Sequence, residues 1–319
     1  MNARRLSMDA NGVVRPSGYT RVHPSPGRRL VLLVHGYNNN FAEAGEGYFA
    51  LRRNLDNLLR NCGIGDPARK HFQQEIWEFF WPGFQPLSYV SATGSARSFA
   101  ESVASAPTYP LEVAKARSWV PNGLASYLNS VLPSEIFFIG HSLGCRVILE
   151  TMARLTAPPH RIAISGFMLM AGAVPIHLLL ESSTLFQNAR RGGKRYCLYS
   201  WMDTVLGIAF PPGQIAAGEI PPYGLPVATG LVGIPSSLYD LRNNTSLGHG
   251  GYWKQSFFRG QSSYTDLVSQ ALGVTTDRSV AENELKEMGE AFRSREVPSR
   301  LVTLRALLGD DWLADMYQN

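Results

Sequence analysis

The sequence predicts an α/β fold in which a mostly parallel central sheet is covered by helices on both faces. Short apolar runs of strand length alternate along the chain with segments of helical periodicity. The first run, at 30–34, is apolar throughout, as is typical of a strand buried on both faces of a parallel sheet. Several of these predicted strands are followed at once by residues of types that can perform chemistry. Those residues then lie at the edge of the sheet where such sheets bind ligands.

The expected elements follow one another in a regular order. Strands are expected at residues 30–34, 75–81, 137–139, 162–170, 196–200 and 238–241, and helices at 41–59, 111–131, 147–155 and 175–190. The helix at 111–131 carries an apolar stripe that begins with Leu111. The density of proline and glycine at 205–237 predicts no regular helix or central strand there, and 84–110 is expected to form a loop or cover near the site.

Length and composition fit one sizeable α/β domain with a segment at each end. At 319 residues, with 45% of them hydrophobic, the chain can fill a large core. We predict an N-terminal arm at 1–29, the α/β domain at 30–275 and a C-terminal helical appendage at 276–319. Prolines favour an extended arm or a short antiparallel edge, outside the core, for the first segment, and the capping-box pair Ser279 and Glu282 favours helices in the last.

The charge pattern gives no sign of a nucleic-acid partner. The formal charge of +5 comes from 30 basic and 25 acidic residues, and the basic residues occur as scattered pairs instead of a stripe interleaved with aromatic residues. The three cysteines lie far apart and have neither metal-site nor redox spacing. We therefore expect no nucleic acid, no metal and no cofactor.

The N-terminus and the hydropathy pattern predict a soluble cytoplasmic protein. No apolar stretch follows Arg4 and Arg5 near the N-terminus, so no secretory signal is expected. The chain has no apolar run of about eighteen residues, so we also expect no transmembrane segment. Export by a route that reads no N-terminal signal stays open as an alternative.

The motif that organises the chain is Gly-His-Ser-Leu-Gly at 140–144, between an apolar strand and a helix. Such a strand, sharp turn and helix hold the central serine in strained backbone geometry, where Gly140 and Gly144 avoid collisions with the strand and the helix. We interpret Ser142 as a nucleophile presented by this turn. The alternative is a structural serine in a tight turn.

A serine nucleophile needs a base to take its proton during attack on an acyl group, and histidine fits that task. Among the seven histidines, His249 is the best candidate because it lies late in the chain, in a glycine-rich loop that can approach the turn closely. His35 directly follows the first core strand and is expected to hold loops together through hydrogen bonds. His141 lies beside the serine in the motif and is expected to point elsewhere.

The base in turn needs a carboxylate that fixes its tautomer and stabilises its charged form. Asp203 follows a predicted strand and lies between Ser142 and His249 in the chain, which gives the order Ser, Asp, His. Asp240, shortly before His249, is the rival acid. A plain surface aspartate that caps a turn is the structural alternative for Asp203, which we favour as the acid.

Two backbone N–H groups are expected to bind the oxyanion of a tetrahedral intermediate. The N–H of Leu143 opens the helix after the turn, where backbone amides lack helical partners. The N–H of Tyr37 is the second candidate because it lies in the loop after the first strand. Asn39 and Asn40 are interpreted as caps of the next helix, and Asn38 fits either role.

With these motifs the chain resembles the α/β-hydrolase superfamily from near residue 30 to near residue 272, and more closely a bacterial subfamily described as a domain of unknown function. The likeness is carried by the HGYNNN loop at 35–40, Phe-Trp-Pro at 80–82, the GHSLG turn at 140–144, Asp203 at its strand end and Gly-His-Gly-Gly-Tyr at 248–252. The resemblance implies the α/β-hydrolase fold, with Ser142 as nucleophile, Asp203 as acid and His249 as base. It implies no particular substrate.

These features together predict a cofactor-independent serine esterase of the lipase type. The expected reaction is cleavage of carboxylic esters of lipids or small acyl groups through an acyl-enzyme at Ser142. The apolar segment 205–237 is expected to be an irregular excursion or a wall of the acyl site. Two alternatives stay open: acyl transfer by the same residues, since exclusion of water decides between transfer and hydrolysis, or a catalytically idle fold that serves as an interaction module.

Overall fold

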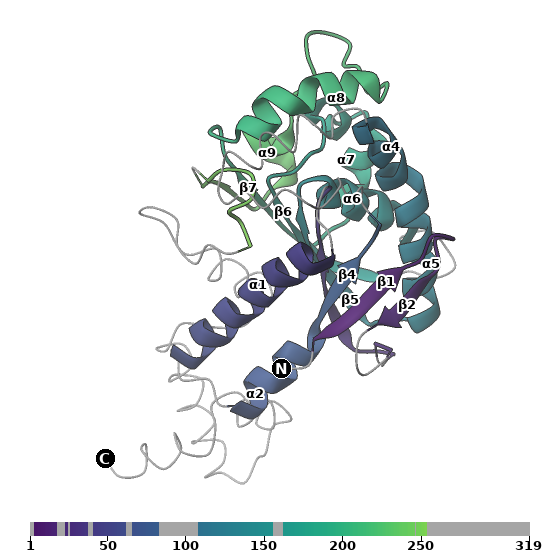
Figure 1. Ribbon diagram of the computed structural model, residues 1–319, viewed down its shortest axis with the longest axis vertical. Helices are drawn as coiled ribbons and strands as arrows, with labels where there is room; N and C mark the ends of the chain where they lie inside the picture. The colour runs from purple at the N-terminus through teal and green to yellow at the C-terminus, as the bar shows by residue number, and fades with distance from the viewer. Residues whose placement is uncertain are drawn as a thin grey trace. The chain divides into compact units, whose positions relative to one another are not determined.

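The computed structural model describes most of the chain up to residue 253 (Figure 1). The described residues are 3–17, 23–24, 26–37, 41–61, 66–82, 108–155, 162–245 and 247–253. By its internal contacts the chain divides into two compact units, Met1–Tyr48 with Ile76–Gln255 and Phe49–Glu75 with Ser256–Asn319. The sheet and every predicted site residue belong to the first unit.

Eight strands form a single sheet in the order β2-β1-β4-β3-β5-β6-β7-β8. Neighbouring strands are parallel throughout, except for the antiparallel pair of β1 and β2. The strands are β1 (Arg4–Met8), β2 (Val14–Ser17), β3 (Arg29–Val34), β4 (Ile76–Phe80), β5 (Glu135–His141), β6 (Ala163–Met170), β7 (Lys194–Tyr199) and β8 (Leu241–Asn244). The α/β class with a mostly parallel central sheet is thereby confirmed.

The central strands are apolar because both of their faces are buried. Every residue from Leu30 to Val34 in β3 is at most 1% exposed, and so is each residue from Ile136 to Ile139 in β5. Strands of this kind carry hydrophobic residues at successive positions instead of alternating ones. Burial of these runs fixes the sheet, and the polar residues that follow each run then meet at its carboxyl edge.

Two strands of the first unit lie within the segment expected to be an arm. β1 pairs antiparallel with β2 and parallel with β4, so this hairpin extends the sheet at one edge. Leu6 of β1 is fully buried, and the Arg5 guanidinium bonds to the buried carboxylate of Glu78 at 2.8 Å. The short antiparallel edge, one of the two expected forms, is confirmed, but the expectation that this segment lies outside the core is wrong, because Leu6, Met8 and Val14 are buried.

The helices expected at 41–59 and 147–155 lie close to their expected positions, and a helix that was not expected follows the first of them at 66–75. The α-helices of the described residues are α1 (Phe41–Asn61), α2 (Asp66–Glu75), α4 (Tyr109–Ala114), α5 (Val120–Val131), α6 (Leu143–Leu155), α7 (Thr184–Ala189), α8 (Phe210–Ala216) and α9 (Thr229–Val232). Helices α5 and α6 pack against each other and against the sheet, and α7 packs against α6 (Figure 1).

The helix expected at 111–131 is a continuous run of α4, the π-helical turn η2 (Lys115–Trp119) and α5. Leu111, expected in its apolar stripe, is instead 59% exposed. The buried face passes through Val113, Ala116 and Val120. A π-helical turn adds a residue to the helical repeat, which displaces the stripe from the positions that regular spacing predicts.

The prediction of one continuous helix at 175–190 is wrong. The structure has a short 3₁₀ helix, η3 (Ile176–Leu179), followed by α7, which begins after Ser183. The Ser183 hydroxyl accepts a hydrogen bond from the Phe186 N–H at 3.1 Å, so it caps a new helix. The last strand also lies later than expected, at β8, after the 3₁₀ helix η5 (Ser236–Leu238).

The segment 205–237 contains short helices, contrary to the prediction from its prolines. A π-helical turn, η4 (Val205–Ala209), leads directly into α8, and α9 follows before the chain returns to the sheet. Pro211 and Pro212 occupy the first turn of α8. The helix continues from η4 into α8, with the Phe210 N–H bonded to the Val205 carbonyl oxygen, so the two prolines directly follow a π-helical turn that shifts the register of the helix.

Several predictions fall on residues outside the described ranges. These are most of the cover expected at 84–110, the side-chain caps expected at Asn39 and Asn40, the undecided role of Asn38, and the C-terminal appendage at 276–319. Across the ranges that the structure does describe, no helix combines the length and the apolar character needed to cross a lipid bilayer.

Candidate active site

The turn that carries Ser142 is a single residue between β5 and α6. Its backbone φ is 53°, in the left-handed region that residues other than glycine rarely occupy. A Cβ on Gly144 would lie 2.4 Å from the His35 carbonyl oxygen. A Cβ on Gly140 would lie 2.4 Å from a side chain of α6. The strain expected at the serine and the clearance expected from the two glycines are confirmed.

The loop after β3 lies directly against the serine. A Cβ on Gly36 would lie 2.6 Å from the Ser142 Cβ and 3.2 Å from its Oγ. Backbone can approach the hydroxyl this closely because glycine carries no side chain. The residue that follows, Tyr37, is the one whose N–H is expected to be an oxyanion donor.

Ser142, His249 and Asp203 form a continuous hydrogen-bonded chain. The distance from His249 Nε2 to Ser142 Oγ is 2.9 Å, and that from His249 Nδ1 to Asp203 Oδ2 is 2.8 Å. An ionised carboxylate can only accept, so Nδ1 carries the proton and the lone pair of Nε2 faces the serine hydroxyl. This tautomer is ready to remove the hydroxyl proton.

Asp203 is held in place on both of its oxygens. Its side chain is fully buried, and its Oδ1 accepts from the Leu206 N–H at 3.0 Å while Oδ2 accepts from His249. The rival acid Asp240 bonds elsewhere: its carboxylate accepts from the Arg195 N–H at 2.7 Å and from the Arg195 guanidinium at 3.0 Å. Asp203, as expected, is the acid that contacts the histidine.

His35 links the loops after β3 and β4, as expected from the sequence. The Trp81 N–H donates to His35 Nε2 at 3.2 Å, so Nδ1 carries the proton and donates to the Gly36 carbonyl oxygen at 2.8 Å. The indole N–H of Trp81 donates to the His35 carbonyl oxygen at 3.0 Å, and the two rings stack. Burial lowers the pKa of His35 to about 4, so the ring is neutral near pH 7.

This contact of His35 also orients the expected oxyanion donor. In a trans peptide the carbonyl of one residue and the N–H of the next point in opposite directions. Because His35 binds the Gly36 carbonyl, the Tyr37 N–H is directed away from the imidazole. The Leu143 N–H is the first in α6, where no helical acceptor exists. Both expected donors therefore lie on backbone that adjoins Ser142.

His141 has a role that the sequence did not reveal. Its Nε2 lies 2.7 Å from the His249 carbonyl oxygen, which can only accept, so Nε2 is the protonated nitrogen. Its Nδ1 is buried and has no hydrogen-bond partner among the described residues. Burial and the neighbouring His249 lower the pKa of His141 to about 3, which keeps the ring neutral.

The loop that carries His249 is thereby fixed at several points. His141 holds its backbone, and the His141 ring packs against the rings of Tyr252 and Trp253. At the start of the loop, the Thr245 N–H donates to the Tyr199 carbonyl oxygen at 2.8 Å, which ties the loop to the end of β7. The histidine side chain is thus positioned through its main chain as well as through Asp203.

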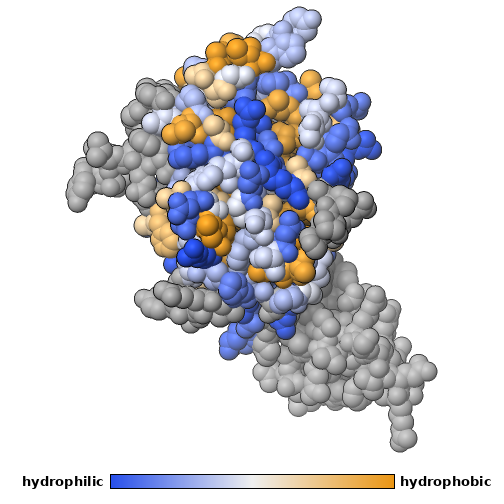
Figure 2. Space-filling model, turned by 90° about the vertical axis from the view of Figure 1, so that its right-hand side faces the viewer, coloured by the Kyte–Doolittle hydropathy of each residue, from blue (hydrophilic) through white to orange (hydrophobic). Residues whose placement is uncertain are grey.

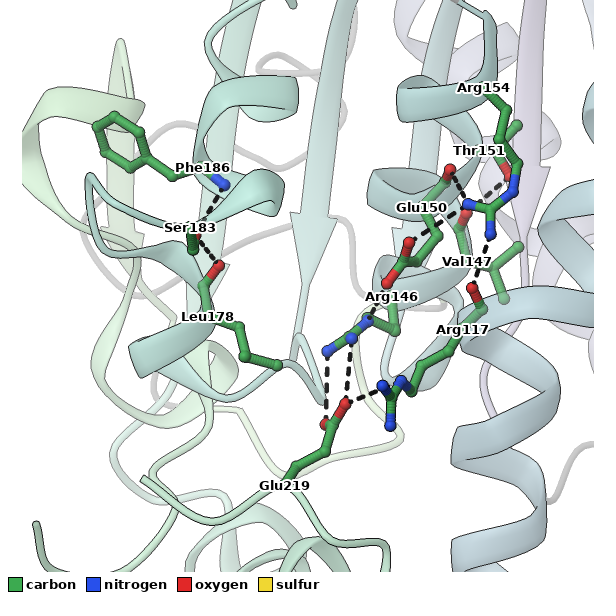
Figure 3. A network of polar contacts seen from close by, with 10 residues as sticks. All are labelled: Arg117, Arg146, Val147, Glu150, Thr151, Arg154, Leu178, Ser183, Phe186 and Glu219. Carbon is green, nitrogen blue, oxygen red and sulfur yellow. Dashed lines mark hydrogen bonds and ion pairs between the residues drawn. The ribbon is translucent and has the colours of Figure 1, made fainter. Parts of the chain in front are cut away.

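Residues 201–238, here named the excursion, leave the sheet after β7 and return before β8. One ion-pair network ties the excursion to α6 (Figure 3). The buried carboxylate of Glu219 accepts from Arg146 at 3.0 Å and from Arg117 at 3.4 Å. Arg146, one turn after Ser142 in α6, also bonds to Glu150 at 3.0 Å. Nothing in the sequence pairs these residues, which are joined only by the fold.

The excursion begins and ends beside the hydrogen-bonded chain. Asp203 is its third residue, and on its way back to the sheet its Gly230 carbonyl oxygen accepts from the Ser200 N–H at 2.9 Å. In between, the Gln214 side chain bonds to the Tyr109 hydroxyl at 2.9 Å, and the Tyr109 ring meets the Tyr37 ring edge-on at 5.5 Å. Helix α8 therefore adjoins the loop that touches Ser142.

Within the described residues, no group of three or more histidine, cysteine, aspartate or glutamate side chains is placed to hold a metal ion. Cys145 and Cys197 are buried, and the Cys145 thiol donates to the Met170 carbonyl oxygen at 3.6 Å. Comparison of the sequence with models of protein families and with curated proteins finds no match.

The close packing at Gly144 predicts a loss of stability on substitution. In Gly144→Ala the new methyl group would meet backbone oxygens of His35 and Val34 that cannot move independently of the sheet. We expect the free energy of unfolding to fall by roughly 1–3 kcal/mol, measured by urea unfolding. The matched control is Gly45→Ala in α1, where the nearest atom is the end of the Arg5 side chain at 3.9 Å and a gain of about 1 kcal/mol is expected. Equal stabilities of the two variants would refute the clash.

The two neutral histidines predict a loss of stability at acid pH. Their pKa values in the folded protein, about 4 for His35 and about 3 for His141, lie below that of an unfolded histidine, which is about 6.5. Between these values the unfolded chain binds more protons, so the free energy of unfolding falls as the pH falls below about 6.5, by about 1.4 kcal/mol per pKa unit.

His141→Gln removes one of these groups while an amide N–H replaces the imidazole donor. Urea unfolding from about pH 7 to about pH 4 should therefore show a shallower loss of stability for this variant than for the wild type. A variant whose stability depends on pH as steeply as that of the wild type would show that His141 is not held neutral by the fold.

Proposed function

We propose that this protein is a serine hydrolase with the α/β-hydrolase fold, and that it cleaves carboxylic esters of lipids or small acyl groups. The observation that carries the proposal is the chain of hydrogen bonds from Ser142 Oγ through His249 to Asp203. It starts at a serine in a strained turn at the carboxyl edge of a mostly parallel sheet, where nucleophiles of this class are presented.

The reaction begins when His249 Nε2 takes the hydroxyl proton of Ser142 as Oγ bonds to the ester carbonyl carbon. Asp203 holds the Nδ1 proton and stabilises the imidazolium without taking that proton. The carbonyl oxygen becomes an oxyanion, which the N–H groups of Leu143 and Tyr37 bind. Each such donor is typically worth about 3 kcal/mol of transition-state stabilisation.

The tetrahedral intermediate collapses when the bond to the leaving alcohol breaks and His249 returns its proton to the departing oxygen. The acyl group stays on Ser142 Oγ as an ester. Water then attacks the same carbonyl carbon with His249 as its base, the second intermediate collapses, and the free acid leaves as Ser142 recovers its proton. In every step of the cycle, His249 is the group that takes up the proton and gives it back.

The nucleophile can be tested with a fluorophosphonate, which forms a stable bond to an activated serine. We expect labelling of the wild type and none of Ser142→Ala, because the alanine has no oxygen to react. Ser183→Ala is a matched control, since the Ser183 hydroxyl caps α7 by accepting from the Phe186 N–H. Persistent labelling of Ser142→Ala would assign the reaction to another residue, and a wild type that is never labelled would favour an idle interaction module.

The reaction class can be tested with a chain-length series of p-nitrophenyl esters. Hydrolysis releases the free acid, whereas acyl transfer delivers the acyl group to an added alcohol in competition with water. We expect the free acid as the main product. A product that is mainly the new ester would identify an acyltransferase instead.

The acid can be tested by a pair of amide substitutions. In Asp203→Asn the carboxylate that fixes the tautomer of His249 is lost, so kcat should fall by roughly 10³- to 10⁴-fold. Asp240→Asn is the matched control, because Asp240 bonds to Arg195 and should leave kcat within a few-fold of the wild type. Ester turnover measures both. If Asp240→Asn alone abolishes turnover in a folded protein, the assignment of Asp203 is wrong.

A further inference from the structure

The exposed surface of the excursion carries no ionised side chain. Its sequence contains no lysine, arginine or histidine, and its two carboxylates are Asp203 and Glu219. Both are buried and paired, Asp203 with His249 and Glu219 with Arg146 and Arg117. A surface of this length without charge is unusual in a protein with 55 charged residues of four types spread over 319 positions.

Large apolar and aromatic side chains take the place of charges on this surface. Those that are more than two fifths exposed are Trp201, Met202, Ile208, Ile215, Ile220, Tyr223 and Leu225. Tyr223 is 93% exposed, in the loop that Figure 1 draws beyond α8. Figure 2 shows hydrophobic surface at the top of the view, the end at which Figure 1 places α8. Exposed apolar patches of this kind mark interaction surfaces.

The same surface adjoins the proposed active site. Trp201 and Met202 directly precede Asp203 in the chain, and α8 reaches the loop after β3 through Gln214 and Tyr109. The Glu219 network fixes the excursion to the helix that begins after Ser142 (Figure 3). A hydrophobic phase in contact with this surface would lie beside the nucleophile.

We propose that the excursion docks on a neutral lipid surface and that the ester substrate is a lipid presented there. This inference rests on the proposed function and specifies its substrate class. An uncharged surface favours neutral or zwitterionic head groups over anionic ones, because it gains nothing from their charge. Exposed tryptophan and tyrosine suit the boundary between hydrocarbon and water. The uncharged loop around Tyr223, with Ile220 and Leu225 exposed on either side, extends beyond α8 in Figure 1, as insertion into a lipid layer requires.

Binding can be measured apart from catalysis with the full chain carrying Ser142→Ala, which leaves the lipid intact. We expect this protein to co-sediment with phosphatidylcholine vesicles, with an affinity that is nearly equal at low and high salt. Attraction of a basic protein to lipid by charge alone would instead weaken as salt rises. No co-sedimentation, or binding that is lost at high salt, would overturn the proposal.

The surface is tested by adding Ile220→Ser and Leu225→Ser to this protein. Both side chains are more than three fifths exposed, so the fold should tolerate the change. The loss of two inserted apolar side chains should weaken vesicle binding by about tenfold or more. The control pair is Val13→Ser and Leu132→Ser, exposed apolar residues outside the excursion, which should leave binding unchanged. Equal binding by the two pairs would refute the assignment.

Two further measurements separate the possible failures. If the double variant does not fold, Tyr223→Ser alone gives the same test at a nearly fully exposed side chain. If sedimentation velocity shows a dimer that the excursion substitutions dissociate, and vesicles do not bind, the surface pairs with a second copy and the proposal is wrong.

Fluorophosphonate labelling of the wild type without vesicles tests the proposed function separately. Labelling without vesicle binding refutes only the lipid surface, and vesicle binding without labelling refutes only the hydrolase.

Discussion

The one-residue turn at Ser142 is the constraint on which the rest of the site depends. The positive φ of Ser142 is unfavourable by itself, because Ser142 carries a side chain. It persists because the surrounding backbone holds the residue in this conformation. Gly144 packs against the end of β3, and Gly36 packs against the serine from the loop that follows. The contacts around the turn therefore bring the loop after β3 within reach of the Ser142 hydroxyl group.

Neutral, buried imidazoles support this arrangement from two sides. His35 binds the Gly36 carbonyl, and His141 binds the His249 carbonyl, so each fixes a main-chain group rather than a side chain. Both rings are kept uncharged by burial, which lowers their pKa values. His249 differs from them in both of its contacts, since a carboxylate faces one nitrogen and a hydroxyl the other. The three histidines therefore differ in role because they differ in hydrogen-bond partners: His35 and His141 position the backbone, and His249 contacts the serine and the aspartate.

The parts of the fold set by local pattern were predictable from the sequence, and the parts set by long-range contact were not. The apolar run at 30–34 and the glycine-flanked Ser142 carry their own signals, because burial on two faces and a sharp turn each demand particular residue types. The short helices after residue 205 do not follow from the sequence, because proline and glycine predict a break there and the π-helical turn before Pro211 has no local sequence signal. The bond from His141 to the base loop depends on the folded chain, so spacing could not reveal it.

The ion pair between Glu219 and Arg146 restricts how this chain can vary. Loss of Arg146 leaves the buried Glu219 with Arg117 alone, and loss of Glu219 leaves the buried Arg146 with Glu150 alone. Breaking a buried pair typically costs about 3–5 kcal/mol, and a remaining partner offsets part of that cost, whereas replacing both by apolar residues of similar size is often tolerated. Positions 146 and 219 are therefore expected to change together in divergent relatives, even though they lie far apart in the sequence. The exposed residues of the excursion take no part in this ion pair, so they can be substituted independently. The binding surface can therefore change while the bond between Glu219 and Arg146 is kept.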